Sequence, residues 1–84
     1  MSQSYQHTPK PATSADCDDA WIAQRRAIMF RDGHAVRGGA GPWIEVQTIN
    51  EPKQWCTLTL PGGALVFASV ADRDAVLSKL WGRT

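Results

Sequence analysis

The fold is decided by residues 43–81, which read WIEVQTINEPKQWCTLTLPGGALVFASVADRDAVLSKLW. Between Trp55 and Leu60, apolar side chains hold the even positions, and Trp or Thr holds the odd ones. A period of two is that of a β-strand with one face toward a core. We therefore expect this stretch to form part of an antiparallel sheet.

The following Pro61-Gly62-Gly63 predicts a two-residue hairpin turn, because glycine accepts the positive φ that such turns require. That turn would place Leu60 opposite Leu65. We expect the strand 43–49 to join through a loop over 50–54, because this length places Val46 opposite Leu58 and keeps apolar side chains on one face. The expected core face consists of Ile44, Val46, Cys56, Leu58, Leu60, Leu65 and Phe67.

A helix is predicted immediately after this run. Ser69 can cap the amide of Asp72 while the Asp72 carboxylate reaches back, as in a capping box. The apolar residues of the predicted helix fall on one stripe, and Gly82 can close its C-terminus. The stripe consists of Val76, Leu77, Leu80 and Trp81. We expect this helix to cover the core face of the sheet.

The opposite face of the predicted sheet carries large apolar side chains that water does not favour. It consists of Trp43, Glu45, Gln47, Ile49, Trp55, Thr57, Thr59, Val66 and Ala68. Either the N-terminal segment covers this face, which is the commoner solution, or the face contacts a protein partner or a second copy of the chain. The candidate partner-binding residues are Trp43, Gln47, Ile49, Trp55 and Thr57.

The N-terminal segment predicts a helix from about Asp16 to Arg26. Acidic residues lie near its start and arginines near its end, which suits the helix dipole. Asp32-Gly33 between apolar residues indicates a hairpin turn, so residues 27–37 are open to either a longer helix or a short hairpin, and we favour the hairpin. The predicted fold class is α+β: a meander of three to five antiparallel strands, packed by a C-terminal helix and joined by an N-terminal helix.

Composition predicts a single small domain over residues 16–84 after a flexible, disordered polar tail over 1–15. Nine basic and eight acidic side chains leave the net charge close to zero, which argues against a polycation made for nucleic acid or anionic membranes. The polar N-terminus and the lack of a long apolar stretch predict a cytoplasmic protein without membrane contact.

The sequence predicts no metal site and no cofactor. Cys17 and Cys56 lack the spacing of metal ligands, and Cys56, on the expected core face, is best interpreted as an inert small apolar residue. A Cys17–His34 nucleophile pair would need a third group to orient its base. The glycine-rich loop over 38–42 precedes a strand, whereas phosphate-binding loops lead into helices, so we interpret it as a flexible connector.

Arginines are concentrated between Trp21 and Gly41, where only Asp32 opposes them. Beside aromatic residues they could contact phosphates and stack on bases, although four charges make a small footprint. The candidate nucleic-acid-binding residues are Arg25, Arg26, Arg31 and Arg37.

Three hypotheses for function follow. The first is a small non-enzymatic binding protein (an adaptor, regulator or inhibitor of a larger macromolecule) that uses the aromatic sheet face or a strand edge. The second is a nucleic-acid-binding module that uses the arginines. An enzyme is a remote third hypothesis, since no motif joins a nucleophile, a base and an oxyanion donor.

Overall fold

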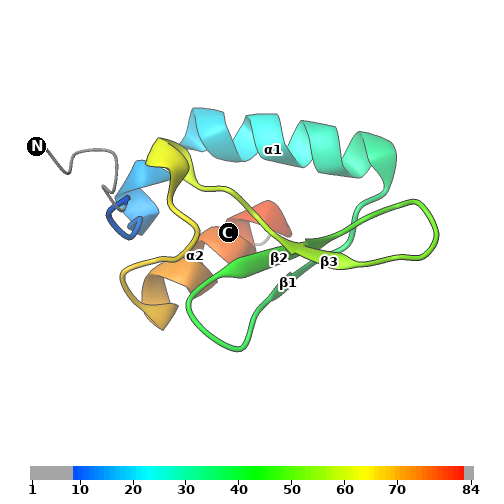
Figure 1. Ribbon diagram of the computed structural model, residues 1–84. Helices are drawn as coiled ribbons and strands as arrows, with labels where there is room; N and C mark the ends of the chain where they lie inside the picture. The colour runs from blue at the N-terminus through cyan, green and yellow to red at the C-terminus, as the bar shows by residue number, and fades with distance from the viewer. Residues whose placement is uncertain (1–8, 83–84) are drawn as a thin grey trace, which may run out of the picture.

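The computed structural model describes residues 9–82 and shows a small α+β fold (Figure 1). Its elements in chain order are the 3-10 helix η2 (Ser14–Asp16), α1 (Asp19–Asp32), β1 (Val36–Gly38), β2 (Ile44–Gln47), β3 (Trp55–Thr57), the 3-10 helix η3 (Pro61–Gly63) and α2 (Val70–Leu80). The three strands form one antiparallel sheet in the order β1-β2-β3. The predicted fold class is confirmed.

The register of β2 and β3 differs from the predicted one. Val46 lies opposite Cys56, two residues earlier than expected, and the pairing continues to Thr48, whose N–H donates to Gln54 O (2.8 Å). The loop beyond this pair covers 49–53, so it keeps the predicted length and begins one residue earlier. A shift of two residues preserves the alternation of faces. Ile44 and Val46 therefore still face the core, and Glu45 and Gln47 still face away from it.

The predicted hairpin after β3 does not form. Pro61–Gly63 is a 3-10 turn, and the chain beyond it bridges in parallel with Ala12, which lies next to Phe67. Ala12 N donates to Val66 O (2.9 Å), and Ala68 N donates to Ala12 O (2.7 Å). Phe67 is buried in the core as predicted, whereas Leu65 is 52% exposed, contrary to the prediction.

Part of the segment assigned to the tail is therefore in contact with the domain. Ala12 is buried, and Thr13 and Asp16 cap η2. The polar composition of this segment did not indicate that it packs on the domain, because the contact consists of a short backbone ladder and one small apolar side chain. Residues 1–8 of the predicted tail lie outside the described residues.

α1 begins later and ends later than predicted. Asp18 caps its N-terminus by accepting from Trp21 N (2.8 Å). Gly33, with φ of 80°, terminates the helix, and its N–H donates to Met29 O (2.8 Å). The Asp32-Gly33 pair is therefore a helix terminus and the hairpin prediction over 27–37 is wrong, although β1 follows shortly after it.

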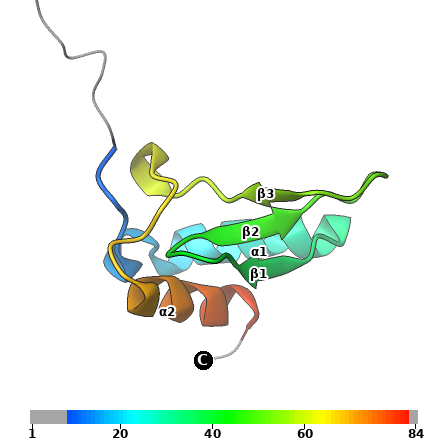
Figure 2. The same cartoon turned by 60° about the horizontal axis from the view of Figure 1, so that its bottom comes forward.

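α1 lies across one face of the sheet, and α2 runs along its β1 edge (Figures 1 and 2). α1 crosses the face that carries Val46 and Leu58, and α2 packs along β1 and against α1. The core between them contains Ala12, Cys17, Ile22, Met29, Ile44, Leu60, Ala64, Phe67, Val76, Leu77 and Leu80. The expectation that the N-terminal segment covers the opposite face is wrong, because α1 shares the Ile44 side with α2.

Within residues 9–82, neither helix combines the length and the apolar character that a membrane crossing requires.

The predicted cap of α2 is present, and it also holds the N-terminal segment. Asp72 N donates to the Ser69 hydroxyl (3.1 Å), which in turn donates to the Asp72 carboxylate (2.9 Å). The same carboxylate accepts from Ser14 N (3.0 Å), and these bonds, the one from Ser14 first, lower the pKa of Asp72 below its ordinary 3.8.

We expect this carboxylate to make folding stability pH-dependent. Because the folded-state pKa is lowered, its contribution is complete above the ordinary aspartate value and is lost as the pH falls through the lowered one. Asp72→Asn should lower the free energy of unfolding at pH 7, and the difference from the wild type should shrink on acidification. Urea unfolding at several pH values measures this, with Glu51→Gln in an exposed loop as the control. A difference that stays constant down to pH 2 would contradict this role.

Candidate functional site

The open face of the sheet, the side away from α1, is organised around Glu45 on the central strand. Arg37 Nε on β1 donates to Glu45 Oε1 (2.7 Å), and the Trp43 indole donates to Glu45 Oε2 (3.0 Å). These two bonds, the indole first, lower the pKa of Glu45. The Arg37 guanidinium also lies 3.9 Å from the centre of the Trp55 ring on β3. One cation thus links a side chain from each of the three strands.

Trp43 is held in place by the glycine-rich loop before β2. A Cβ atom at Gly39 or Gly41 would overlap its indole, so the loop wraps around the ring only because those positions lack side chains. The loop is also bonded to α2, because Arg73 Nη1 donates to Gly39 O (3.0 Å) and Gly41 O (2.8 Å). The loop is therefore a packed element that contacts both Trp43 and α2.

The structure brings together four of the five predicted partner-binding residues. Trp43, Gln47, Trp55 and Thr57 share the open face, whereas Ile49 lies beyond the end of β2 in the connection to β3. Trp43 and Trp55 are both half-buried, but for different reasons. Trp43 packs in its own loop, while Trp55 lies under the Arg37 guanidinium. Trp55 is consequently the better candidate for contact with a partner.

The two edges of the sheet are treated differently. α2 protects the β1 edge, where the Trp81 indole donates to Val36 O (3.1 Å). The β3 edge has no neighbouring strand among residues 9–82 (Figure 2). An unpaired edge presents N–H and C=O groups that can accept another strand.

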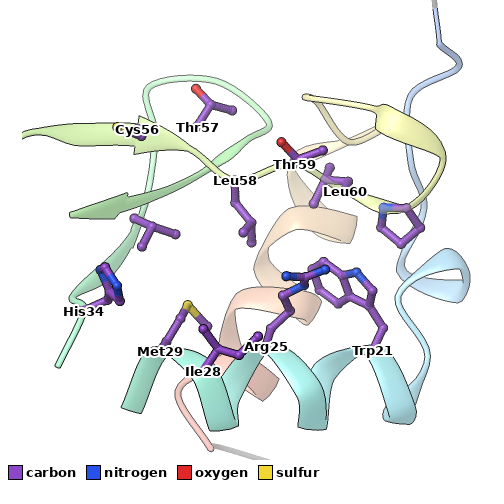
Figure 3. Close-up of a pocket in the computed structure, with 12 residues that line it drawn as sticks. Trp21, Arg25, Ile28, Met29, His34, Cys56, Thr57, Leu58, Thr59 and Leu60 are labelled. Atoms are coloured by element: carbon purple, nitrogen blue, oxygen red, sulfur yellow. The ribbon is translucent and has the colours of Figure 1, made fainter. Parts of the chain in front are cut away.

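A groove of about 410 Å³ runs between α1 and β3, next to this open edge (Figure 3). Its lining is mainly apolar, with Arg25 and His34 as the basic side chains. It consists of Trp21, Arg25, Ile28, Met29, His34, Val46, Cys56, Thr57, Leu58, Thr59, Leu60 and Pro61. The sequence did not predict the groove, because its walls come from a helix assigned to the other face of the sheet.

The predicted arginine patch is not one surface. Arg25 lies over Trp21 (5.5 Å) and lines the groove, whereas Arg26 lies over Phe30 (5.2 Å) and beside Gly82 at the end of α2. Arg31 pairs with Asp32 at the exposed end of α1, at 3.2 Å. Arg37 is on the open face of the sheet, away from α1. Four arginines that are close in sequence thus lie in four different environments.

The cysteines and histidines do not form a catalytic arrangement in the described part of the chain. Cys17 and His34 flank α1, whose 14 residues separate them by about 20 Å. Cys56 and His34 line the same groove, but His34 Nδ1 is 2.7 Å from Gln47 O, and His34 Nε2 is 4.0 Å from Asp32 Oδ2. These contacts of the ring nitrogens are to Gln47 and Asp32 and not to the thiol. Residues 9–82 also contain no group of three or more His, Cys, Asp and Glu side chains arranged to hold a metal ion.

Comparisons with known proteins give no match of this chain to a protein-family model, a curated protein or a solved structure.

We expect the glycine loop and Trp43 to be energetically coupled. Gly39→Ala should lower the free energy of unfolding by about 1–3 kcal/mol, because the new methyl group overlaps the indole. In a Trp43→Ala background the same change should cost much less, and urea unfolding of the four proteins gives the coupling. Gly38→Ala, whose methyl group meets the Arg73 guanidinium at 3.0 Å and not the Trp43 indole, is the matched control. Equal costs in both backgrounds would contradict the packing role of the loop.

The two thiols should differ in reactivity. Cys56 is exposed, which corrects its prediction as a core residue, whereas Cys17 is 1% exposed. Burial, and then the neighbouring Asp16, raise the pKa of Cys17 to about 11. A disulfide reagent at pH 8 should therefore label one thiol rapidly, and Cys56→Ser should remove that phase. Rapid labelling that persists in Cys56→Ser would show that Cys17 is accessible in the native state.

Proposed function

We propose that this chain is a small non-enzymatic binding protein that contacts a larger macromolecule through the β3 side of its sheet. The observation that carries the proposal is the one-sided packing of the helices. α1 and α2 cover the Ile44 face and the β1 edge, and they leave Trp55 beside an edge that has no strand neighbour in residues 9–82.

The side chains on the open face are held in position before any partner arrives. Glu45 accepts a hydrogen bond from Arg37, and the Arg37 guanidinium lies over the Trp55 ring. Tryptophan and arginine are the residues that most often dominate binding energy at protein interfaces. Because their geometry is already restricted, little side-chain entropy is lost when they are buried by a partner.

A protein partner suits this face better than a nucleic acid does. Arg37 on this face already has a carboxylate partner, Glu45, which also repels phosphate groups. The remaining predicted arginines lie on or beside α1, in separate environments. Nucleic-acid binding through these arginines remains the competing hypothesis, and the test below separates the two.

The test is retention of a partner from lysate of the source cells on immobilised protein, with and without nuclease. Trp55→Ala and Thr57→Lys should each abolish retention of a nuclease-resistant protein, because they remove or obstruct the open face beside β3. Phe30→Ala deletes a 54% exposed aromatic ring on α1 and should leave retention unchanged.

The opposite pattern would overturn the proposal. Arg26→Glu with Arg31→Glu reverses two arginines outside the groove and the open face. Loss of binding in this double variant but not in Trp55→Ala, together with sensitivity to nuclease, would identify a nucleic acid as the partner.

A further inference from the structure

Resting on that proposed function, we infer that the partner contributes an extended segment that adds to β3 as a fourth strand. The segment would carry apolar side chains at alternate positions and a carboxylate for Arg25. Three features of the β3 side carry this inference: the hydrogen-bonding groups of the edge, the apolar groove behind it and the charge of that groove.

The backbone of β3 is arranged to accept a strand. Leu58 N donates to Ile44 O (2.8 Å), and Thr48 N donates to Gln54 O (2.8 Å), so the even residues of this strand bond to β2. In an antiparallel ladder the odd residues then direct their N–H and C=O groups to the other side. Trp55 and Thr57 therefore present their backbone groups along the open edge.

The groove suits the side chains of such a strand. Alternate side chains of an added strand point to opposite faces of the sheet. One set would enter the groove and meet Ile28, Leu58 and the Trp21 ring (Figure 3). The other set would lie on the open face beside Trp55 and Thr57. An alternating apolar and polar segment matches these two environments.

The charge of the groove indicates an acidic residue in the occupant. Within residues 9–82, Arg25 Nε and Arg26 Nε are both buried without a hydrogen-bond partner, but Arg25 alone of the two lines the groove, whose described lining contains no Asp or Glu. A buried guanidinium nitrogen without a partner is costly, and a carboxylate is its strongest acceptor. We therefore assign to the occupant one Asp or Glu on its groove-facing side.

The same charge argument favours a different protein over this chain itself. In a symmetric pairing of two β3 edges, each copy would offer residues 53–61, which include no acidic residue. Residues 1–8 include none either. Neither segment supplies the carboxylate that Arg25 lacks, whereas an acidic peptide does.

The experiment is a selection of random 12-residue peptides displayed on phage against the immobilised full-length protein. Enriched peptides are then synthesised, and their affinities are measured by fluorescence anisotropy. We expect sequences with apolar residues at every second position and at least one Asp or Glu. Bound peptide should also slow alkylation of Cys56, which lines the groove.

Two matched pairs of variants test the binding mode. Arg25→Gln should weaken the selected peptides roughly tenfold, whereas Arg26→Gln, which removes a charge on the other side of α1, should change affinity less than about twofold. Thr57→Pro removes an N–H of the open edge and should abolish binding, while Thr57→Val keeps that N–H and should retain it. Circular dichroism and urea unfolding establish that each variant is folded.

Several outcomes would overturn the inference: no enriched sequence, apolar residues enriched at the helical spacing of three and four, or affinity unaffected by Arg25→Gln. Light scattering that shows a dimer dissociated by Thr57→Pro would assign the edge to a second copy instead. If a lysate partner is lost with Trp55→Ala but kept with Arg25→Gln and Thr57→Pro, the proposed function is supported and the added strand alone is contradicted. If all of these variants retain that partner, both the proposed function and the added strand are contradicted.

Discussion

The structure depends on where its helices pack, since residues 9–82 provide two α-helices for a sheet that has two faces and two edges. α1 and α2 both take the face on which Ile44 is fully buried, and α2 additionally closes the β1 edge. Concentrating the apolar side chains in one core is the more stable arrangement, because a second thin core would bury little additional area. The exposure of the other face and of β3 is a direct consequence of this arrangement.

The open face can be exposed to solvent because its aromatic rings contact charged side chains. Glu45 accepts from both Arg37 and Trp43, and Arg37 covers part of Trp55. Each tryptophan thereby loses some contact with water without a covering element. The arrangement also restricts the rotamers of these side chains, a property that favours binding as much as it favours stability.

Local rules identified two helices, the strands around Val46 and Cys56 and the cap of α2, and distant contacts decided the rest. The alternation around Val46 predicted which residues face the core, and Ser69 with Asp72 predicted the start of α2. The register was wrong because a shift of two residues leaves the alternation unchanged, so parity cannot detect it.

The failure at Gly62-Gly63 has a different cause. Two glycines with positive φ suit a hairpin turn, and both do adopt positive φ here, but within η3. What prevents the hairpin is the pairing of Phe67 with Ala12, a residue far away in sequence. The groove was missed for a related reason. The side of the sheet that α1 covers is set by tertiary packing, and no sequence pattern within α1 indicates it.

The two edges of the sheet differ, because β1 is protected and β3 is exposed. Proteins normally protect an edge strand, and this chain does so at β1 with an indole from Trp81 on a strand carbonyl. At β3 the protection is limited to the shortness of the strand, Trp55–Thr57. A short strand limits indiscriminate pairing, because few backbone bonds are gained unless the incoming side chains also fit the adjacent groove. Backbone bonds alone would let such an edge pair with many segments, and in the binding mode proposed above the need for apolar side chains and a carboxylate at Arg25 would restrict that choice.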